Sequence, residues 1–396
     1  MRIWGGLALG LAMATTAFAA PNVTNFTQKG SLLYFADIRI DQGAQGPWNT
    51  LVRIQNDGNS DIDVKCYWMD GNKNRLDFVL PLTANQAVWF DARTGRGTYQ
   101  VNPFPQAQAN GFPAANQNPF LNPPTGPYFK GLLVCWAIDN QELKQIKWNH
   151  LSGTATVSNA GRNSAYEYAA NAFFAPSGAD LGQVGATPGR LNLNGLDYDA
   201  CPLYLIGQFS PVGAVPPVPA APSPSELRLV TAACTLDLRQ DWVPTWSKLQ
   251  FDIWNEEEVK FTGAYECADS WHESPLAPGQ NSHPGVGIAF YDGVDAGGQA
   301  FLFGTLGTYA ARYRVQAVKS TQCDWLKPTS GPGSQFSGVA TSAYGLIGIQ
   351  YTDFNQAVGG PVIIRGGGGT PLAAAGKFNG TIRWDVEFVT PEGGVQ

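Results

Sequence analysis

Histidine and carboxylate side chains could give this chain acid–base chemistry, because their protonation states change most readily in the range where proteins work. The sequence has only three histidines, His150, His272 and His283, and each lies in a polar, loop-like stretch. A serine hydrolase would need one of them near a nucleophilic serine, and the Gly-x-Ser-x-Gly pentapeptide of one large hydrolase class is absent. We therefore predict no catalytic residues and no enzymatic activity.

Glycosidases use a pair of carboxylates with separated pKa values, and the acidic residues here offer no obvious pair. The densest acidic run is Glu256–Glu258, between two alternating apolar segments. Like charges at such a corner are typical of a solvated hairpin turn.

Carbohydrate binding needs an exposed aromatic ring with polar groups beside it. Trp271, His272 and Glu273 place an indole, an imidazole and a carboxylate next to one another. Trp246 lies beside the start of a predicted strand and is a second aromatic candidate. We predict these four as binding candidates, and a structural role for Trp246 is the competing interpretation.

Calcium would suit an acidic extracellular protein, because it takes oxygen ligands. Asp57, Asn59 and Asp61 present side-chain oxygens at alternate positions. However, an EF-hand loop requires glycine where Ile62 stands and glutamate where Trp68 stands. We predict a turn there, with calcium as the alternative, and no other cofactor or metal.

The elements that must position these groups are strands. Residues 50–56 alternate apolar and polar side chains and lead into a tight-turn pair, Asp57-Gly58. Leu32–Ile40 is a longer, mostly apolar run, and Trp246–Trp271 reads as strand, turn, strand. Residues 101–128 are rich in Pro, Asn and Gln and predict a long loop. The sequence lacks a convincing helical period, so we predict an all-β fold.

Landmark residues recur in the same order in the two halves of the chain. They are Ile38, Ile40, Gln42 and Trp48 against Leu236, Leu238, Gln240 and Trp246, Asn56 against Asn255, and Cys66 against Cys267. This order favours an internal duplication. With short strands and polar turns, it predicts two tandem antiparallel β-sandwich (Ig-like) domains, residues 20–210 and 226–396, joined by a Pro-rich linker at residues 211–225.

The first 19 residues have the pattern of a secretory signal peptide, with cleavage expected between Ala19 and Ala20. No later stretch is apolar enough to cross a bilayer as a helix. With 25 basic and 31 acidic residues, the chain is acidic, which argues against nucleic acid as a partner. We therefore predict an exported protein, periplasmic, extracellular or at the cell surface, without a membrane span.

Six cysteines follow the predicted signal peptide: Cys66, Cys135, Cys201, Cys234, Cys267 and Cys323. An even number in an exported chain favours disulfides. The duplication predicts one bridge in each half, Cys66 with Cys135 and Cys267 with Cys323, and a third between the remaining two cysteines. A rival scheme joins Cys234 to Cys267 and leaves Cys201 free.

One segment resembles a motif of uncharacterised exported proteins of Gram-negative bacteria. In that motif, a strand ending in Trp-Asn-Glu leads through Phe-(Ser/Thr)-Gly to a cysteine and a tryptophan. The matching positions are Trp254, Asn255, Glu256, Phe261, Thr262, Gly263, Cys267 and Trp271. The resemblance implies an envelope or secreted location and no particular activity.

These observations predict a secreted or periplasmic, non-enzymatic structural or binding protein of the cell envelope. One alternative is a carbohydrate-binding module or a glycan-active hydrolase. Another is a self-associating surface subunit. A glycan or another envelope protein is the expected partner, and the oligomeric state is left open.

Overall fold

The structure is a computed structural model. It describes residues 23–41, 48–70, 75–92, 128–139, 144–160, 164–209, 226–239, 242–243, 246–255, 257–261, 265–275, 311–326, 341–357 and 363–386. The predicted signal peptide, residues 101–127 of the predicted loop, the linker at 211–225 and His283 lie outside these residues.

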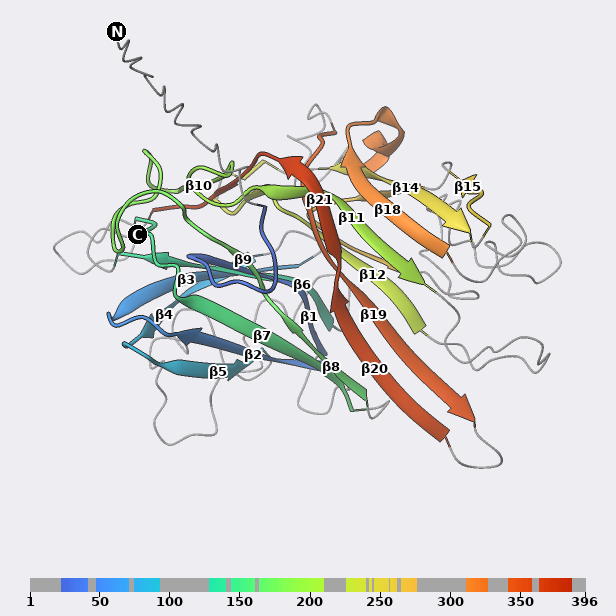
Figure 1. Ribbon diagram of the computed structural model, residues 1–396, viewed down its shortest axis with the longest axis horizontal. Coiled ribbons are helices and arrows are strands. Elements are labelled where there is room, and N and C mark those ends of the chain that lie inside the picture. The colour runs from blue at the N-terminus through green and yellow to red at the C-terminus, as the bar shows by residue number, and fades with distance from the viewer. Residues whose placement is uncertain are drawn as a thin grey trace, which may run out of the picture.

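The described part of the chain is built almost entirely of strands (Figure 1). Two sheets come from the first part of the chain. The β1 sheet has the order β4 (Arg75–Leu82), β3 (Ile62–Asp70), β6 (Tyr128–Ile138), β1 (Leu32–Asp41), β9 (Asn171–Phe173). The β2 sheet has the order β5 (Ala87–Asp91), β2 (Trp48–Asn56), β7 (Leu151–Asn159), β8 (Ser164–Ala169).

Three more sheets follow. The β12 sheet has the order β17 (Trp271–Pro275), β12 (Glu226–Ala233), β19 (Leu346–Ala357), β20 (Ile363–Pro371). The β14 sheet has the order β15 (Lys260–Phe261), β14 (Ser247–Asn255), β18 (Ala311–Val318), β11 (Cys201–Phe209), β21 (Ala373–Phe378), with β16 (Tyr265–Ala268) also paired to β14. A small third sheet joins β10 (Arg190–Leu193), β22 (Gly380–Arg383) and β13 (Leu236–Asp237).

Burial distinguishes β1 from β2. Every residue from Leu32 to Ile40 is buried, whereas β2 alternates between buried and exposed positions. A strand that is buried throughout must be covered on both faces. On one face, the ring of Phe35 packs against Gly153 of β7, so closely that a Cβ atom at this glycine would clash with it. On the opposite face, the ring of Trp136 packs 5.3 Å from that of Trp384, which follows β22.

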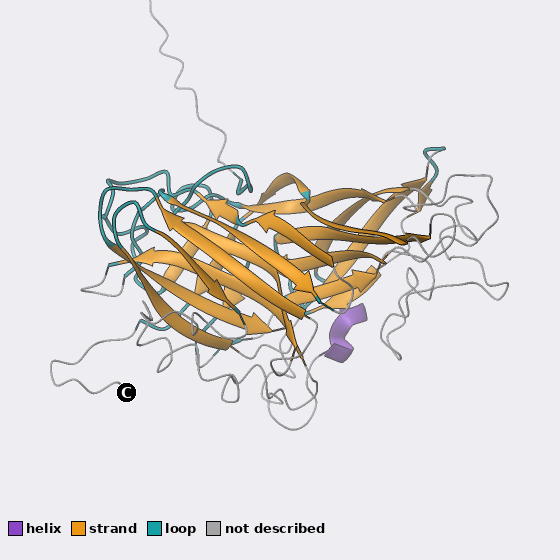
Figure 2. Ribbon diagram, turned by 90° about the horizontal axis from the view of Figure 1, so that it is seen from below, coloured by secondary structure: helices purple, strands orange, loops and turns teal. Residues whose placement is uncertain are grey.

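The β12 sheet lies between the β1 sheet and the β14 sheet. On one side, Trp271 Nε1 donates a 2.8 Å hydrogen bond to the carbonyl of Ala36 on β1. On the other side, the Tyr313 hydroxyl of β18 donates a 2.9 Å hydrogen bond to Gln350 Oε1 of β19. These three sheets are therefore stacked on one another. Figure 2 shows the strands of the molecule, with the short helix η1 (Thr321–Leu326) at the edge.

The all-β, mainly antiparallel prediction is confirmed. Strand pairing does not follow the predicted linker, however, because β11 precedes residue 211 and yet lies between β18 and β21. Instead, the strands up to β9 belong to the β1 and β2 sheets, and the strands from β10 onward belong to the other three sheets. The division into separate domains at 211–225 stays a prediction. Within the described ranges, no helix has the length and apolar character needed to cross a membrane.

Two of the predicted disulfides are present. Cys66 and Cys135 stand opposite each other on β3 and β6, and Cys267 of β16 is bonded to Cys323 of η1. The second bond rules out the rival pairing of Cys234 with Cys267.

The third predicted disulfide is not formed. Cys201 and Cys234 are both buried and free, and both side chains lie beside Gly380. Burial raises the pKa of the Cys234 thiol, and the neighbouring Cys201 adds to the increase. Because the thiolate is the reactive form, this environment disfavours the reactive form of Cys234.

Thiol counting tests this arrangement. Denatured, unreduced protein should react with a thiol reagent at two positions, and reduced protein at all six. The double variant Cys201→Ala/Cys234→Ala should give no reaction before reduction. A wild-type protein without reactive thiols would show instead that the third bond forms.

Candidate functional site

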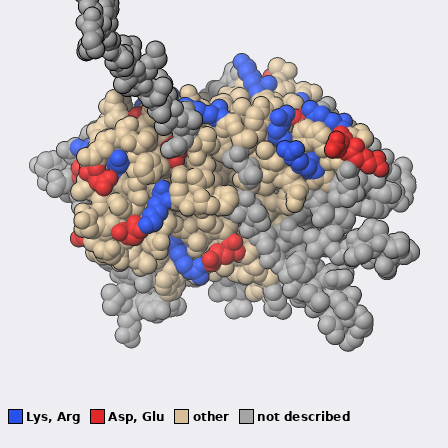
Figure 3. All heavy atoms as spheres, viewed as in Figure 1, with Lys and Arg blue, Asp and Glu red and all other residues tan. Residues whose placement is uncertain are grey.

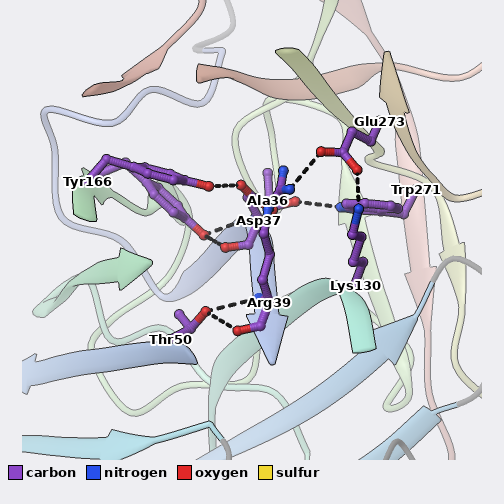
Figure 4. A network of polar contacts seen from close by, with 9 residues as sticks. Ala36, Asp37, Arg39, Thr50, Lys130, Tyr166, Trp271 and Glu273 are labelled. Atoms are coloured by element: carbon purple, nitrogen blue, oxygen red, sulfur yellow. Dashed lines mark hydrogen bonds and ion pairs between the residues drawn. The ribbon is translucent and has the colours of Figure 1, made fainter. Parts of the chain in front are cut away.

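The most concentrated group of charges lies inside the molecule, around Arg39 of β1 (Figure 4). The Arg39 side chain is only 1% exposed, and that of Asp37 is fully buried. Arg39 Nε donates a 2.8 Å hydrogen bond to Asp37 Oδ1, and Nη1 donates a 2.6 Å bond to Glu273 Oε1 of β17. Burying a charge is costly unless it is paired, so these partners are a condition for the fold.

Glu273 completes the cluster. Its second carboxylate oxygen accepts a 2.7 Å hydrogen bond from Lys130 Nζ of β6. Two cations therefore face two carboxylates, Asp37 and Glu273. Burial alone would lower the pKa of Arg39, but the charges of Asp37 and Glu273 outweigh it and raise that pKa above its ordinary value. Arg39 is thus held in its charged form.

The backbone of β1 helps to aim these side chains. The pairing of β1 with β6 shifts register between Phe35 and Ile38, so the strand is irregular, as at a β-bulge, in the segment that contains Asp37. Bulges commonly redirect a side chain. Thr50 of β2 then holds the strand after the bulge, because its hydroxyl accepts from Arg39 N and donates to Arg39 O, both at 2.9 Å.

Tyrosines of β8 close the cluster on the side of the β2 sheet. The Tyr166 hydroxyl donates to Asp37 Oδ2, and the Tyr168 hydroxyl donates a 2.6 Å bond to the carbonyl of Asp37. Burial raises the pKa of both hydroxyls, and the charge of Asp37 adds to the increase. Both tyrosines therefore stay protonated and act as donors.

Aromatic rings cover the guanidinium group. The centroids of the Trp48 and Tyr351 rings lie 5.2 and 5.9 Å from Arg39 Cζ. The cluster thus joins the β2, β1 and β12 sheets through one buried cation. The chemical effect of this arrangement is to hold β17 against β1 and β6.

The structure separates the residues predicted as a binding trio. Successive side chains of a strand point to opposite faces. Trp271 and Glu273 of β17 both point toward β1, where they contact Ala36 and Arg39 (Figure 4). His272 points the other way, and its Nε2 lies 2.8 Å from Glu266 Oε2 of β16. These three side chains therefore do not form one binding site.

The imidazole of His272 contacts a carboxylate that is only 1% exposed. Burial would lower the pKa of His272, but Glu266 above all, and then Glu273 and Asp269, raise it above its ordinary value. The pair is a structural contact between the β12 and β14 sheets, and its strength depends on pH.

Trp246 is also buried, at 1% exposure, so it has no open ring face for a sugar. This burial favours the structural interpretation of Trp246, and its role as a binding residue stays a prediction. Sequence alternation alone did not reveal that the residue before β14 enters the core.

The predicted turn at Asp57 is present. Asn56 Oδ1 accepts hydrogen bonds from Gly58 N at 3.0 Å and from Trp148 Nε1 at 2.8 Å. The oxygens weighed as calcium ligands do not converge. Asp57 pairs with Lys29, Asp61 Oδ1 accepts from Ala84 N at 2.8 Å, and Asn59 is exposed. The described residues contain no cluster of three or more His, Cys, Asp or Glu side chains suited to a metal.

Arg39 and Asp37 are not among the residues predicted from the sequence, although they carry a sequence signal. Both interrupt the apolar run Leu32–Ile40. Charged residues in a strand that is buried on both faces must be paired, so their presence there predicts a buried partner of opposite charge.

No protein-family model and no curated protein matches the chain. The geometry is therefore the basis for assigning a function.

Replacing Glu273 tests the structural role of the cluster. Glu273→Gln keeps the size of the side chain but leaves Arg39 and Lys130 facing one buried carboxylate. Breaking a buried ion pair costs about 3–5 kcal/mol, so we expect the free energy of unfolding from urea denaturation to fall by about that amount.

Glu167→Gln is the matched control. Its ion pair with Arg53 is about half exposed on both sides, and a surface pair contributes less than about 1 kcal/mol. Equal losses in the two variants would contradict the role of the cluster.

The His272–Glu266 contact predicts a pH dependence. Because the folded pKa of His272 is raised, its contribution to stability is complete below the unfolded value of about 6.5 and is lost as pH rises through the folded pKa. The stability difference between wild type and His272→Asn should therefore shrink on going from about pH 5.5 to about pH 8.5. Glu266→Gln should flatten the dependence, and a difference that grows with pH would indicate a lowered pKa instead.

Proposed function

We propose that this chain is an exported, non-enzymatic structural or binding protein of the cell envelope. One observation carries the proposal: the polar residues best able to do chemistry are used to join the sheets. Both carboxylate oxygens of Glu273 are bonded to cations, and Arg39 is enclosed between Asp37 and Glu273. A group that is already held in this way is suited to stability rather than to turnover.

The location proposed for the protein has separate support. Residues 1–19 have the signal-peptide pattern, and two disulfides are compatible with an oxidising compartment. The motif that ends at Cys267 and Trp271 resembles one in exported proteins of Gram-negative bacteria.

We also propose that the two halves arose by duplication into Ig-like sandwich units. In support, the matched residues Asn56 and Asn255 have the same role at the ends of β2 and β14. Asn56 Oδ1 accepts a hydrogen bond from Gly58 N, and Asn255 Oδ1 accepts one from Glu257 N at 3.0 Å. Each asparagine side chain thus closes a turn onto the backbone N–H two residues later in the chain. On this proposal the halves have diverged, since their disulfides join different kinds of element.

Expression in a Gram-negative host tests the proposal. The mature protein should be recovered outside the cytoplasm, beginning at Ala20, as read by cell fractionation and intact mass. A thermal-shift screen of the purified protein with calcium and a panel of polysaccharides should raise the melting temperature with at least one ligand, because a ligand at about 100 times its Kd adds about 2.7 kcal/mol of stability.

The screened polysaccharides should remain intact. Depolymerisation that disappears on changing one Asp or Glu residue would contradict the non-enzymatic proposal. Retention of the full-length chain in the cytoplasm would contradict export.

A further inference from the structure

The outer face of the β14 sheet gathers side chains of an unusual kind. The inner positions of β14 and β18 are apolar and buried, including Phe251, Ile253, Tyr313 and Val315. Strand alternation therefore turns the residues between them outward. Trp254 stands opposite Arg312 across the strand pair, and Asp252 stands opposite Arg314.

Three cations surround the half-buried ring of Trp254. Lys260 Nζ lies 5.3 Å from its centroid, Arg312 Cζ 5.5 Å and Arg314 Cζ 5.9 Å. At such separations each cation is attracted to the electron-rich face of the ring. The ring and its cations therefore hold one another in place before any ligand arrives.

The pattern extends on both sides of Trp254. Arg314 Cζ also lies 4.6 Å from the centroid of Tyr204 on β11, so this guanidinium stands between two aromatic rings. On β14, Lys248 Nζ lies 4.5 Å from the centroid of Tyr265 of β16. Aromatic rings and cations thus alternate across neighbouring strands of one face.

The charge of this face is opposite to that of the whole chain. Among the described side chains of these strands, Lys248, Lys260, Arg312 and Arg314 face one carboxylate, that of Asp252, on a protein of net charge −6. Figure 3 shows Lys and Arg side chains gathering over the region of β14, β15 and β18, with acidic side chains at its end. A local basic patch on an acidic protein attracts an anionic partner to that place.

One of these cations is available to a ligand. Asp252 accepts from Arg314 and lies 3.4 Å from Lys260 Nζ, so it engages two of the four cations. Arg312 is exposed, and within the described ranges it has no carboxylate partner. A guanidinium group forms paired hydrogen bonds with a carboxylate in a fixed, planar geometry.

We propose that this face binds a linear anionic polysaccharide. A sugar ring would pack on the exposed part of Trp254, and a carboxylate of the same chain would pair with Arg312. Lys248 and Lys260 would supply further attraction along the strands. This inference rests on the proposed binding role and specifies its ligand class and surface.

A single-stranded nucleic acid is the main competing polymer, because it also uses aromatic stacking and a basic groove. Its backbone carries a phosphate at every residue, and its affinity comes mainly from neutralising many of them. A four-cation face on a chain of net charge −6 is poorly suited to that demand. The observations favour a polymer in which sugar rings and spaced carboxylates both contribute.

The test uses the mature full chain and three probes at low salt. Polygalacturonate carries a carboxylate on each sugar, its fully methyl-esterified form has the same backbone without charge, and oligothymidylate represents nucleic acid. Calorimetry should give measurable binding to polygalacturonate that weakens as salt is added. Binding to the methyl-esterified form should be at least about tenfold weaker, because it cannot form the charge-assisted hydrogen bond. Binding to oligothymidylate should also be at least about tenfold weaker, because a four-cation face neutralises few of its phosphates.

Three variants locate the site. Arg312→Gln and Trp254→Ala should each weaken polygalacturonate binding about tenfold or more, by loss of one charged contact or of the ring. Arg53→Gln is the control, because Arg53 is also an exposed cation but lies on the β2 sheet, where it is paired with Glu167. It should bind as wild type does. Arg312 is exposed, so its variant should keep the thermal unfolding temperature of wild type.

Several results would overturn the inference. They are equal binding by wild type and the two face variants, equal binding to the methyl-esterified probe, or tighter binding to oligothymidylate. Each of these leaves the exported, non-enzymatic role standing. Cleavage of polygalacturonate or retention in the cytoplasm would instead contradict the proposed function itself.

Discussion

A charged residue in a strand that is covered on both faces is the constraint on which this structure depends. Arg39 cannot reach water from β1, so its charge must be balanced inside the molecule. Asp37 comes from the same strand, but Glu273 lies 234 residues further along the chain. Since leaving the guanidinium unpaired is costly, correct packing of β1 requires correct placement of β17. One ion cluster thereby makes β1 and β17, which are far apart in the sequence, depend on each other.

That coupling explains why the sheets form one stack. Glu273 and Trp271 bring the β12 sheet against β1, and His272, on the opposite face of the same strand, contacts Glu266 of the β14 sheet. A single short strand therefore joins three sheets through the alternation of its side chains. The β14 sheet is last in the stack and keeps a face toward solvent, where Trp254 and its cations lie.

Stability and binding thus use similar chemistry in different surroundings. Arg39 lies beside the rings of Trp48 and Tyr351 and is closed off by two carboxylates. Arg312 lies beside Trp254 with an open side. Burial and the supply of carboxylates separate a structural cation from one that can meet a ligand. Neither difference can be read from residue type.

The sequence by itself determined the local structure: the strands and the turn after Asn56. These features depend on side-chain period, turn preference and short-range order, which neighbouring residues decide. Only the tertiary structure decided that Glu273 meets Arg39, that β11 joins the β14 sheet and that Trp246 is buried. Those outcomes depend on which distant surfaces pack together. A period of two shows that a strand has two faces, but it does not show what will cover each of them.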